Sequence, residues 1–141
     1  MKILLTNDDG IKAEGIRALY RVLPKGVEVL VVAPSGARSA SGHSISLEHN
    51  IHVKELKWEN GANAYALDGT PVDCVKFAIA KLKCKPDLLL SGVNLGSNTG
   101  ISVFYSGTVA AAREGLFSGI PAIAVSMAGS DCSSYEPATD I

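Results

Sequence analysis

Two adjacent carboxylates, Asp8 and Asp9, follow the first apolar run of the sequence, residues 2–7. Neighbouring carboxylates at the end of a strand repel each other unless a positive group lies beside them. A hard divalent cation such as Mg²⁺ binds carboxylate and other oxygen ligands, so the pair is a candidate metal site. The alternative is that Asn7-Asp8-Asp9-Gly10 is only a turn that caps the next helix. The motif alone leaves both interpretations open.

A loop rich in Gly and Ser, residues 34–44, follows the second apolar run, residues 27–33. A long loop in a compact domain is usually functional. Its Ser39 is a candidate metal ligand, phosphate contact or nucleophile, although a serine in such a loop is ordinarily exposed filler. Arg38 and His43 flank Ser39 and can approach a phosphate, but each is more often a surface residue.

A third loop, residues 91–100 (SGVNLGSNTG), follows another apolar run. Its glycines let backbone amides approach a ligand closely. Asn94 and Asn98 offer amide oxygens for a metal or amide nitrogens for a phosphate. A flexible loop of turn-forming residues is the alternative. The loop contains neither the GxGxxG dinucleotide pattern nor a Walker lysine motif.

A fourth segment, Ser106-Gly107-Thr108, precedes a predicted helix. Backbone N–H groups at a helix start, together with two hydroxyls, form an anion site. Taken alone, the segment is better explained as an ordinary N-terminal cap by Thr108. The four loops together supply acids, a hydroxyl, an amide and an anion site, a combination that fits metal-assisted phosphoryl transfer.

The elements that must position these loops alternate along the chain. Apolar runs predict strands, and apolar spacing of three and four residues predicts helices. Thr70-Pro71-Val72-Asp73 adds a capping Thr, a Pro at the first helical position and an acid three residues after the cap. The expected strands are residues 2–7, 27–33, 88–91 and 122–126, and the expected helices are residues 12–23, 70–82 and 108–117.

Strands joined by helices predict a Rossmann-like α/β fold, with a parallel sheet sandwiched by helices. Residues 45–57 and 63–67 show partial alternation around an Asn60-Gly61 turn, which predicts a β-hairpin inserted between the regular units. Ligands of open sheets bind outside the carboxyl ends of the strands. All four polar loops are expected at that edge.

The bulk composition narrows the class of protein. A chain of 141 residues with 47% hydrophobic residues is expected to form one domain. Its formal net charge of −1 argues against a partner that is a nucleic-acid polymer. The apolar runs are too short for a membrane span, and the N-terminus does not resemble a signal peptide. Three cysteines without CxxC spacing favour a reduced, cytoplasmic protein without disulfides or zinc.

The polar loops resemble those of the SurE family of survival-protein phosphatases, which are 5′/3′-nucleotidases. The resemblance covers nearly the whole chain in the correct order. The matching segments are Asn7-Asp8-Asp9-Gly10, Ala33-Pro34, Arg38-Ser39-Ala40-Ser41-Gly42-His43-Ser44, Gly69-Thr70-Pro71-Val72-Asp73-Cys74-Val75, Ser91-Gly92-Val93-Asn94-Leu95-Gly96-Ser97-Asn98 and Tyr105-Ser106-Gly107-Thr108-Val109-Ala110-Ala111-Ala112-Arg113-Glu114-Gly115.

The resemblance implies a divalent-metal-dependent enzyme that hydrolyses nucleoside 5′- and 3′-monophosphates, and in some members short polyphosphate. One Mg²⁺ or Mn²⁺ ion is then expected on Asp8, Asp9, Ser39 and Asn94, with Asp8, Asp9 and Asn94 as the catalytic residues. The expected substrate contacts are Asn7, Ser39, Gly42, His43, Asn98, Ser106, Gly107 and Thr108.

Members of this family are longer than 141 residues and use a C-terminal part for subunit exchange and oligomerisation. Pro137-Ala138-Thr139-Asp140 predicts the start of a further helix just before the sequence stops. Residues 1–141 are therefore expected to form the nucleotidase domain of a longer protein that is a homodimer or homotetramer.

Two rival interpretations are weaker. A phospho-receiver domain also has an acidic pair after its first strand, but it needs an acceptor aspartate and a lysine where this chain has Asn94 and residues 127–129 (MAG). A haloacid-dehalogenase-like phosphatase needs two aspartates separated by one residue.

No His or Lys lies beside a hydroxyl as in an activated nucleophile, so attack by a metal-activated water is expected. A covalent intermediate on Asp8 or Ser39 is the alternative.

Overall fold

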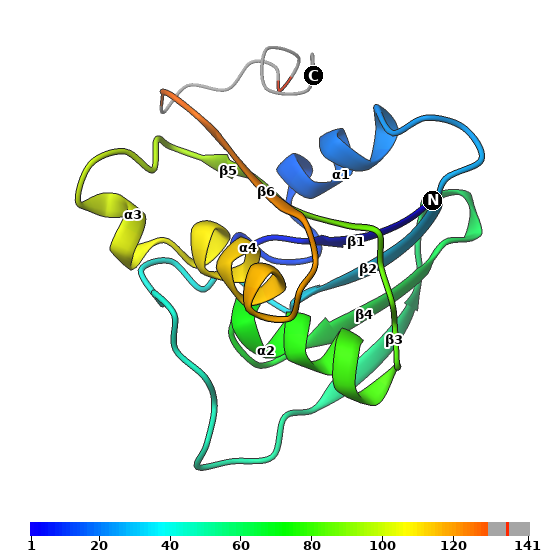
Figure 1. Ribbon diagram of the computed structural model, residues 1–141, viewed down its shortest axis with the longest axis horizontal. Helices are drawn as coiled ribbons and strands as arrows, with labels where there is room; N and C mark the ends of the chain where they lie inside the picture. The colour runs from blue at the N-terminus through cyan, green and yellow to red at the C-terminus, as the bar shows by residue number, and fades with distance from the viewer. Residues whose placement is uncertain (130–134, 136–141) are drawn as a thin grey trace.

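The computed structural model describes residues 1–129 and 135. Its strands form one six-stranded sheet in the order β3-β4-β2-β1-β5-β6 (Figure 1). Every neighbouring pair is parallel except β3 and β4, which are antiparallel at one edge. The strands are β1 (Lys2–Thr6), β2 (Glu28–Pro34), β3 (Val53–Lys57), β4 (Asn63–Leu67), β5 (Leu88–Leu95) and β6 (Ala122–Met127).

Helices cover both faces of this sheet and create two separate cores. Helix α1 (Glu14–Arg21) packs on one face, over buried side chains such as Ile3, Leu5 and Val31. Helices α2 (Pro71–Lys76) and α4 (Gly107–Phe117) pack on the other face, over side chains such as Leu4 and Val32 (Figure 1). Strands buried on both faces read as continuous apolar runs. The predicted three-layer α/β architecture is therefore confirmed.

The local signals in the sequence account for several helix ends. Thr70 and Asp73 form a reciprocal cap at the start of α2: the Asp73 N–H donates to Thr70 Oγ1 at 3.1 Å, and the Thr70 N–H donates to Asp73 Oδ2 at 2.8 Å. A π-helix, Phe77–Lys81, continues α2 close to the expected end. Helix α1 is two residues shorter at each end than the predicted 12–23, because it begins after Ala13, whose φ/ψ is extended.

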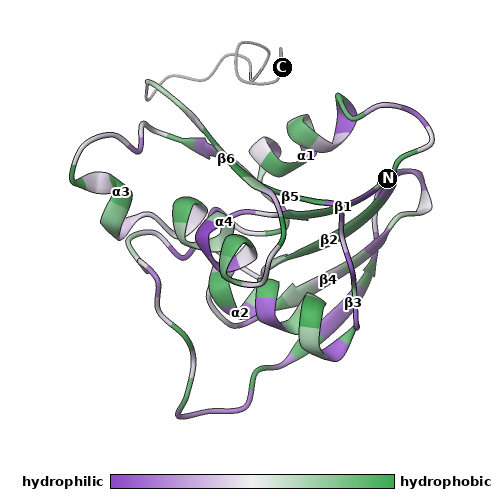
Figure 2. Ribbon diagram, viewed as in Figure 1, coloured by the Kyte–Doolittle hydropathy of each residue, from purple (hydrophilic) through white to green (hydrophobic). Residues whose placement is uncertain are grey.

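The inserted hairpin is partly a correction. β3 and β4 do form an antiparallel hairpin, connected through a 3-10 turn at Glu59–Gly61. However, β4 also pairs with β2, so the hairpin extends the main sheet and is not a separate excursion. Residues 45–52 form no strand, and β3 is largely exposed. Its charged residues, Lys54, Glu55 and Lys57, give it hydrophilic colour in Figure 2.

The segment after residue 91 differs most from expectation. Strand β5 continues to Leu95, four residues beyond its predicted end at residue 91. It pairs again with β6 after a register shift between Ser91 and Asn94. A short helix, α3 (Ser102–Tyr105), lies between the predicted loop of residues 91–100 and α4 and was not predicted. Helix α4 is capped by Ser106, whose Oγ accepts the Val109 N–H at 3.1 Å, and not by Thr108.

Three further expectations concern the whole chain. No helix among residues 1–129 and 135 is long and apolar enough to cross a membrane. Cys74 and Cys84 are buried free thiols, and Cys74 lies in the core as its helical position predicts. Cys132 and the helix expected from residue 137 lie outside the described residues.

Candidate functional site

Asp8 is a buried carboxylate at the carboxyl edge of the sheet. It lies two residues beyond β1 and is 5% exposed. The Thr108 hydroxyl, in the first turn of α4, donates to Asp8 Oδ1 at 2.5 Å across 100 residues of sequence. A hydrogen bond to a charged group is among the stronger ones. Thr108 therefore orients Asp8 through its side chain, and its predicted substrate contact stays a prediction.

Asn7 fixes the turn that presents Asp8. Its side-chain Nδ2 donates to the Gly10 carbonyl at 3.0 Å, and its Oδ1 accepts the Gly10 N–H at 3.2 Å. The side chain is fully buried. Asn7 thus closes the structural turn that the sequence left as an alternative, and its predicted substrate contact stays a prediction.

Gly107 brings the start of α4 against Asp8. A Cβ added at this position would lie 2.8 Å from Asp8 Cβ, 2.8 Å from Ser41 Oγ and 3.0 Å from Asp8 Oδ2. Real Cβ atoms do not approach so closely, so only glycine allows this packing. Asp8, Asp9, Ser41, Gly107 and Thr108 form a group that we call the carboxylate cluster.

Asp9 is half-buried beside Asp8 and has weak support from the protein. Burial raises the pKa of Asp9, and the charge of Asp8 raises it further. The Leu95 N–H donates to Asp9 Oδ2 at 3.4 Å, a long contact from the end of β5. Within residues 1–129 and 135, neither carboxylate forms an ion pair with a cationic side chain, so their charges lack a positive partner.

Asn94 reaches the same edge from β5. Its Nδ2 donates to the Gly96 carbonyl at 2.7 Å, which fixes the amide and leaves Oδ1 as the available oxygen. Its chain neighbour Leu95 contacts Asp9, so the end of β5 and the acidic turn are adjacent. Asn98 lies further along, where its Nδ2 donates to Ser126 Oγ at 2.8 Å, and it is tied to β6.

The loop after β2 is anchored to the site at both ends. The Arg38 N–H donates to the Asp8 carbonyl at 2.7 Å, and the Gly42 N–H donates to the Tyr105 carbonyl at 2.9 Å. Ser39 follows Arg38 but is exposed, with its hydroxyl hydrogen-bonded to no described residue. The Arg38 guanidinium turns away and donates to the Asp68 carbonyl.

His43 belongs to a chain of hydrogen-bonded polar groups on the flank of α4. Its Nε2 lies 2.9 Å from Glu114 Oε2, and Lys76 Nζ lies 2.9 Å from Glu114 Oε1. Burial alone would raise the pKa of Glu114, but the hydrogen bonds from Lys76 and His43 outweigh it and lower that pKa. His43 therefore ties the loop to α2 and α4. Its predicted substrate contact remains untested.

Two residues that the sequence analysis left unassigned matter in this arrangement. Ser41 places its hydroxyl against Gly107, and Glu114 holds His43. Both lie inside the family-like segments, but nothing in local composition separates Ser41 from the other serines of its loop. Ser41 and Gly107 are 66 residues apart in the sequence, and His43 and Glu114 are 71 residues apart. Local sequence patterns cannot predict contacts over such separations.

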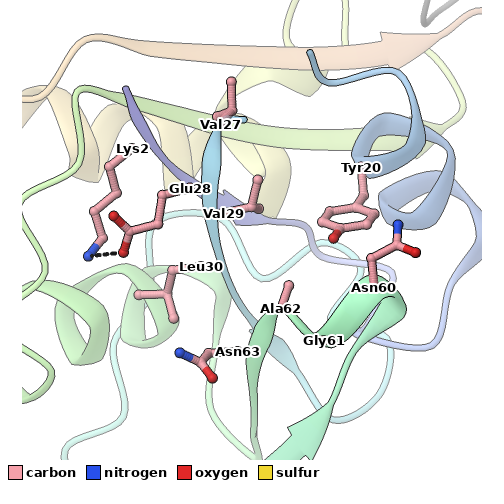
Figure 3. Close-up of a pocket in the computed structure, with 10 residues that line it drawn as sticks. All are labelled: Lys2, Tyr20, Val27, Glu28, Val29, Leu30, Asn60, Gly61, Ala62 and Asn63. Atoms are coloured by element: carbon pink, nitrogen blue, oxygen red, sulfur yellow. Dashed lines mark ion pairs between the residues drawn. The ribbon is translucent and has the colours of Figure 1, made fainter. Parts of the chain in front are cut away.

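The presence of a surface pocket does not by itself identify the functional site. One pocket of about 320 Å³ lies at the opposite, amino ends of β1, β2 and β4, where Lys2 and Glu28 form an ion pair at 2.8 Å (Figure 3). Its other lining groups include Tyr20 and Asn63, and it contains no unpaired carboxylate. β1 separates the two ends by roughly 16 Å. We assign the chemistry to the carboxylate cluster because the uncompensated charge is there.

The cluster has the composition of a site for a hard cation and an anion side by side. Among the described residues, no three His, Cys, Asp or Glu side chains come together, so a cation here would bind two carboxylates and neutral oxygens. The first N–H groups of a helix have no intrahelical acceptor. Ser106 satisfies those of Val109 and Ala110, which leaves those of Gly107 and Thr108 for an anion.

Comparison with known proteins gives consistent matches. The model of the family described as "Survival protein SurE" matches residues 3–141. A protein named 5′-nucleotidase SurE from Pelotomaculum thermopropionicum is 52% identical over 133 residues, which cover 93% of this chain and 51% of that protein. One of the same name from Heliobacterium modesticaldum is 46% identical over 142 residues, covering 99% of this chain and 52% of that protein.

Among solved structures, the SurE protein from Aquifex aeolicus matches with a TM-score of 0.85 and 39% sequence identity. That match covers 99% of this chain and 56% of the crystal structure. The chain therefore spans about half the length of the relatives it matches.

Proposed function

The chain belongs to the SurE family, and from that premise we propose that the intact protein is a divalent-metal-dependent 5′-nucleotidase. The observation that carries this proposal is the carboxylate cluster: two carboxylates without a cationic partner beside the start of α4. The names of the relatives supply the substrate class, nucleoside 5′-monophosphates.

The residues fit one Mg²⁺ or Mn²⁺ ion. Asp8, Asp9 and the Asn94 amide oxygen would hold it, and Ser39 would join them if its exposed loop position turns inward. All these donors are oxygens, the ligand type that hard divalent cations prefer. When bound, such an ion neutralises charge on the phosphate and lowers the pKa of a coordinated water.

The chain's own groups would bind and orient the phosphate. The N–H groups of Gly107 and Thr108 point from the positive end of α4, which favours an anion. Asp8 stays fixed because Thr108 donates to it, and the helix start would bind the phosphate beside this carboxylate. Phosphoryl transfer needs mainly positioning and charge stabilisation. We therefore propose direct attack by water rather than a covalent intermediate on Asp8 or Ser39.

Two exposed aromatic rings favour a nucleotide over a simple phosphate ester. Phe104 is 68% exposed and Tyr105 is 62% exposed, and both lie in α3 directly before the anion-binding turn. A base stacks on an aromatic ring with a stabilisation of about 1–3 kcal/mol. Either ring is near enough in sequence to Gly107 to receive the base of a nucleotide whose phosphate lies at α4.

Wider properties follow from the same premise. We propose that 3′-monophosphates and short polyphosphate are further substrates, because N–H groups at a helix start bind a phosphate whatever group it is attached to. Free buried Cys74 and Cys84 favour a cytoplasmic protein. Exposed apolar side chains on α4 and β6 suit an interface of a homodimer or homotetramer. These are Leu116, Phe117 and Ile123.

The test is a panel of nucleoside 5′- and 3′-monophosphates and polyphosphate, assayed on the intact protein with Mg²⁺, Mn²⁺ and chelator. We expect phosphate release that needs the metal, and loss of both Mn²⁺ affinity and turnover in Asp8→Asn and Asp9→Asn. The control variant is Asp87→Asn, because Asp87 lies at the amino end of β5 and accepts the Lys2 N–H. Unchanged Mn²⁺ affinity in both site variants, measured by calorimetry, would show that the metal assignment is wrong.

A further inference from the structure

Ser41 carries a buried hydroxyl that has no hydrogen-bond partner in the described part of the chain. The hydroxyl is 2.8 Å from the position of a Cβ at residue 107, and the same position is 3.0 Å from Asp8 Oδ2. The oxygen therefore lies against the junction of α4 and the Asp8 carboxylate. Exposed serine hydroxyls bind water, but this one is enclosed among protein groups.

The backbone of the loop holds Ser41 in this place. The residues on both sides of Ser41 have left-handed backbone conformations, with φ of 55° at Ala40 and 53° at Gly42. A left-handed conformation is uncommon for a residue other than Gly, Asn or Asp, and surrounding contacts must maintain it at Ala40. The anchors of Arg38 on Asp8 and of Gly42 on Tyr105 supply those contacts.

The consequence is a division of roles between two serines of one loop. Ser39 is exposed, whereas the Ser41 hydroxyl is buried beside Asp8 and Gly107. A buried hydroxyl without a partner destabilises a fold, because it has lost its hydrogen bonds to water. A protein retains such a group most readily where a ligand supplies the missing partner.

The position of the hydroxyl indicates which ligand that is. Ser41 Oγ lies 2.8 Å from where a Cβ of Gly107 would be. Gly107 is the first residue of α4, where the helix dipole is positive and stabilises an anion rather than a cation. We infer that Ser41 is a substrate-binding residue that donates its hydroxyl hydrogen to a phosphate oxygen, beside the N–H groups of Gly107 and Thr108. This inference rests on the proposed function, because it takes the phosphate to bind at α4.

The test is Ser41→Ala in the intact protein, with inorganic phosphate as the probe and Mn²⁺ present. A hydrogen bond to a charged group is worth about 1.5–3 kcal/mol, so the dissociation constant of phosphate should rise roughly 10-fold or more. The melting temperature should stay the same or rise, because the variant removes an unpaired buried hydroxyl. A purely structural role would not produce this combination.

Two controls make the result specific. Ser35→Ala changes an exposed serine of the same loop and should leave phosphate binding unchanged. Ser41→Cys keeps a similar volume with a weaker donor and should lie between wild type and Ser41→Ala, which also covers the case that the alanine variant fails to fold.

Unchanged phosphate affinity in folded Ser41→Ala would overturn the inference. So would an equal loss of Mn²⁺ affinity measured without phosphate, because it would make Ser41 a metal ligand. Failure of the proposed function gives a different result: wild-type protein would release no phosphate from any nucleotide of the panel, whatever the phosphate affinity of the variants.

Discussion

Gly107→Ala adds one methyl group at the tightest contact of the carboxylate cluster. The new Cβ would lie 2.8 Å from both Asp8 Cβ and Ser41 Oγ. Carbon atoms pack best at about 3.5–4.0 Å, so α4 and the Asp8 turn must separate by roughly 1 Å. The φ of Gly107 is not in the left-handed region, so the backbone accepts alanine and the steric contact is the whole perturbation.

Two magnitudes follow from that displacement. Overpacking by one methyl group usually destabilises a protein by about 1–3 kcal/mol. A shift of about 1 Å in a catalytic group lowers the rate on the order of 100-fold. Because Asp8 itself moves, Mn²⁺ affinity should weaken together with kcat. A side chain that merely occupied the phosphate position would instead leave metal binding intact.

The assay combines steady-state hydrolysis of a nucleoside monophosphate, calorimetry with Mn²⁺ and denaturant unfolding. Gly36→Ala is the matched control, because a Cβ there meets no atom within 4 Å although the residue lies in the neighbouring loop. A Gly107→Ala protein with wild-type kcat and Mn²⁺ affinity would refute the argument that close approach of α4 positions Asp8.

Three other predictions use the same contacts. Thr108→Val removes the donor to Asp8, so denaturant unfolding should show a loss of about 1.5–3 kcal/mol and hydrolysis should slow; unchanged values of both would dismiss the orienting role. Phe104→Ala should raise KM for a nucleoside monophosphate roughly 10-fold while KM for ribose 5-phosphate stays constant, and an equal change for both esters would exclude base stacking. Because the pKa of Glu114 is lowered from 4.5 in the folded state, its stabilisation is present above pH 4.5 and is lost as pH falls through the folded pKa. Unfolding measured from pH 7 to pH 3 should therefore show a stability gap between wild type and Glu114→Gln that shrinks in acid, and a constant gap would contradict this linkage.

The elements of the fold could be predicted because their causes are local. The apolar run of β2 predicts a strand covered on both faces, and the Thr70 and Asp73 pair predicts a helix start that forms as a reciprocal cap. The hairpin was harder, since alternation in residues 45–57 does not say which strand it joins. Pairing of β4 with β2 depends on contacts across more than 30 residues of sequence.

The sequence by itself also predicts a chemistry for the site. An adjacent acidic pair, an asparagine after a buried strand and a Ser-Gly-Thr turn before a helix are features of residue type and order. They predict an edge of the sheet suited to metal-assisted phosphoryl transfer, and the resemblance of longer segments indicated the family to which the chain belongs. No atomic contact was needed for that inference, because oxygen ligands and helix starts have the same chemistry wherever they occur.

Only the tertiary structure shows which contact each of these site residues makes. The Thr108 hydroxyl donates to Asp8, the Asn7 side chain bonds within its own turn, and His43 contacts Glu114. Ser39 is exposed, whereas the hydroxyl of Ser41 is buried. Each outcome depends on a partner brought near by the fold or on a backbone angle that neighbouring loops maintain. Packing in three dimensions decides which of several chemically equivalent side chains lies at the site. The order of residues along the chain does not show this directly.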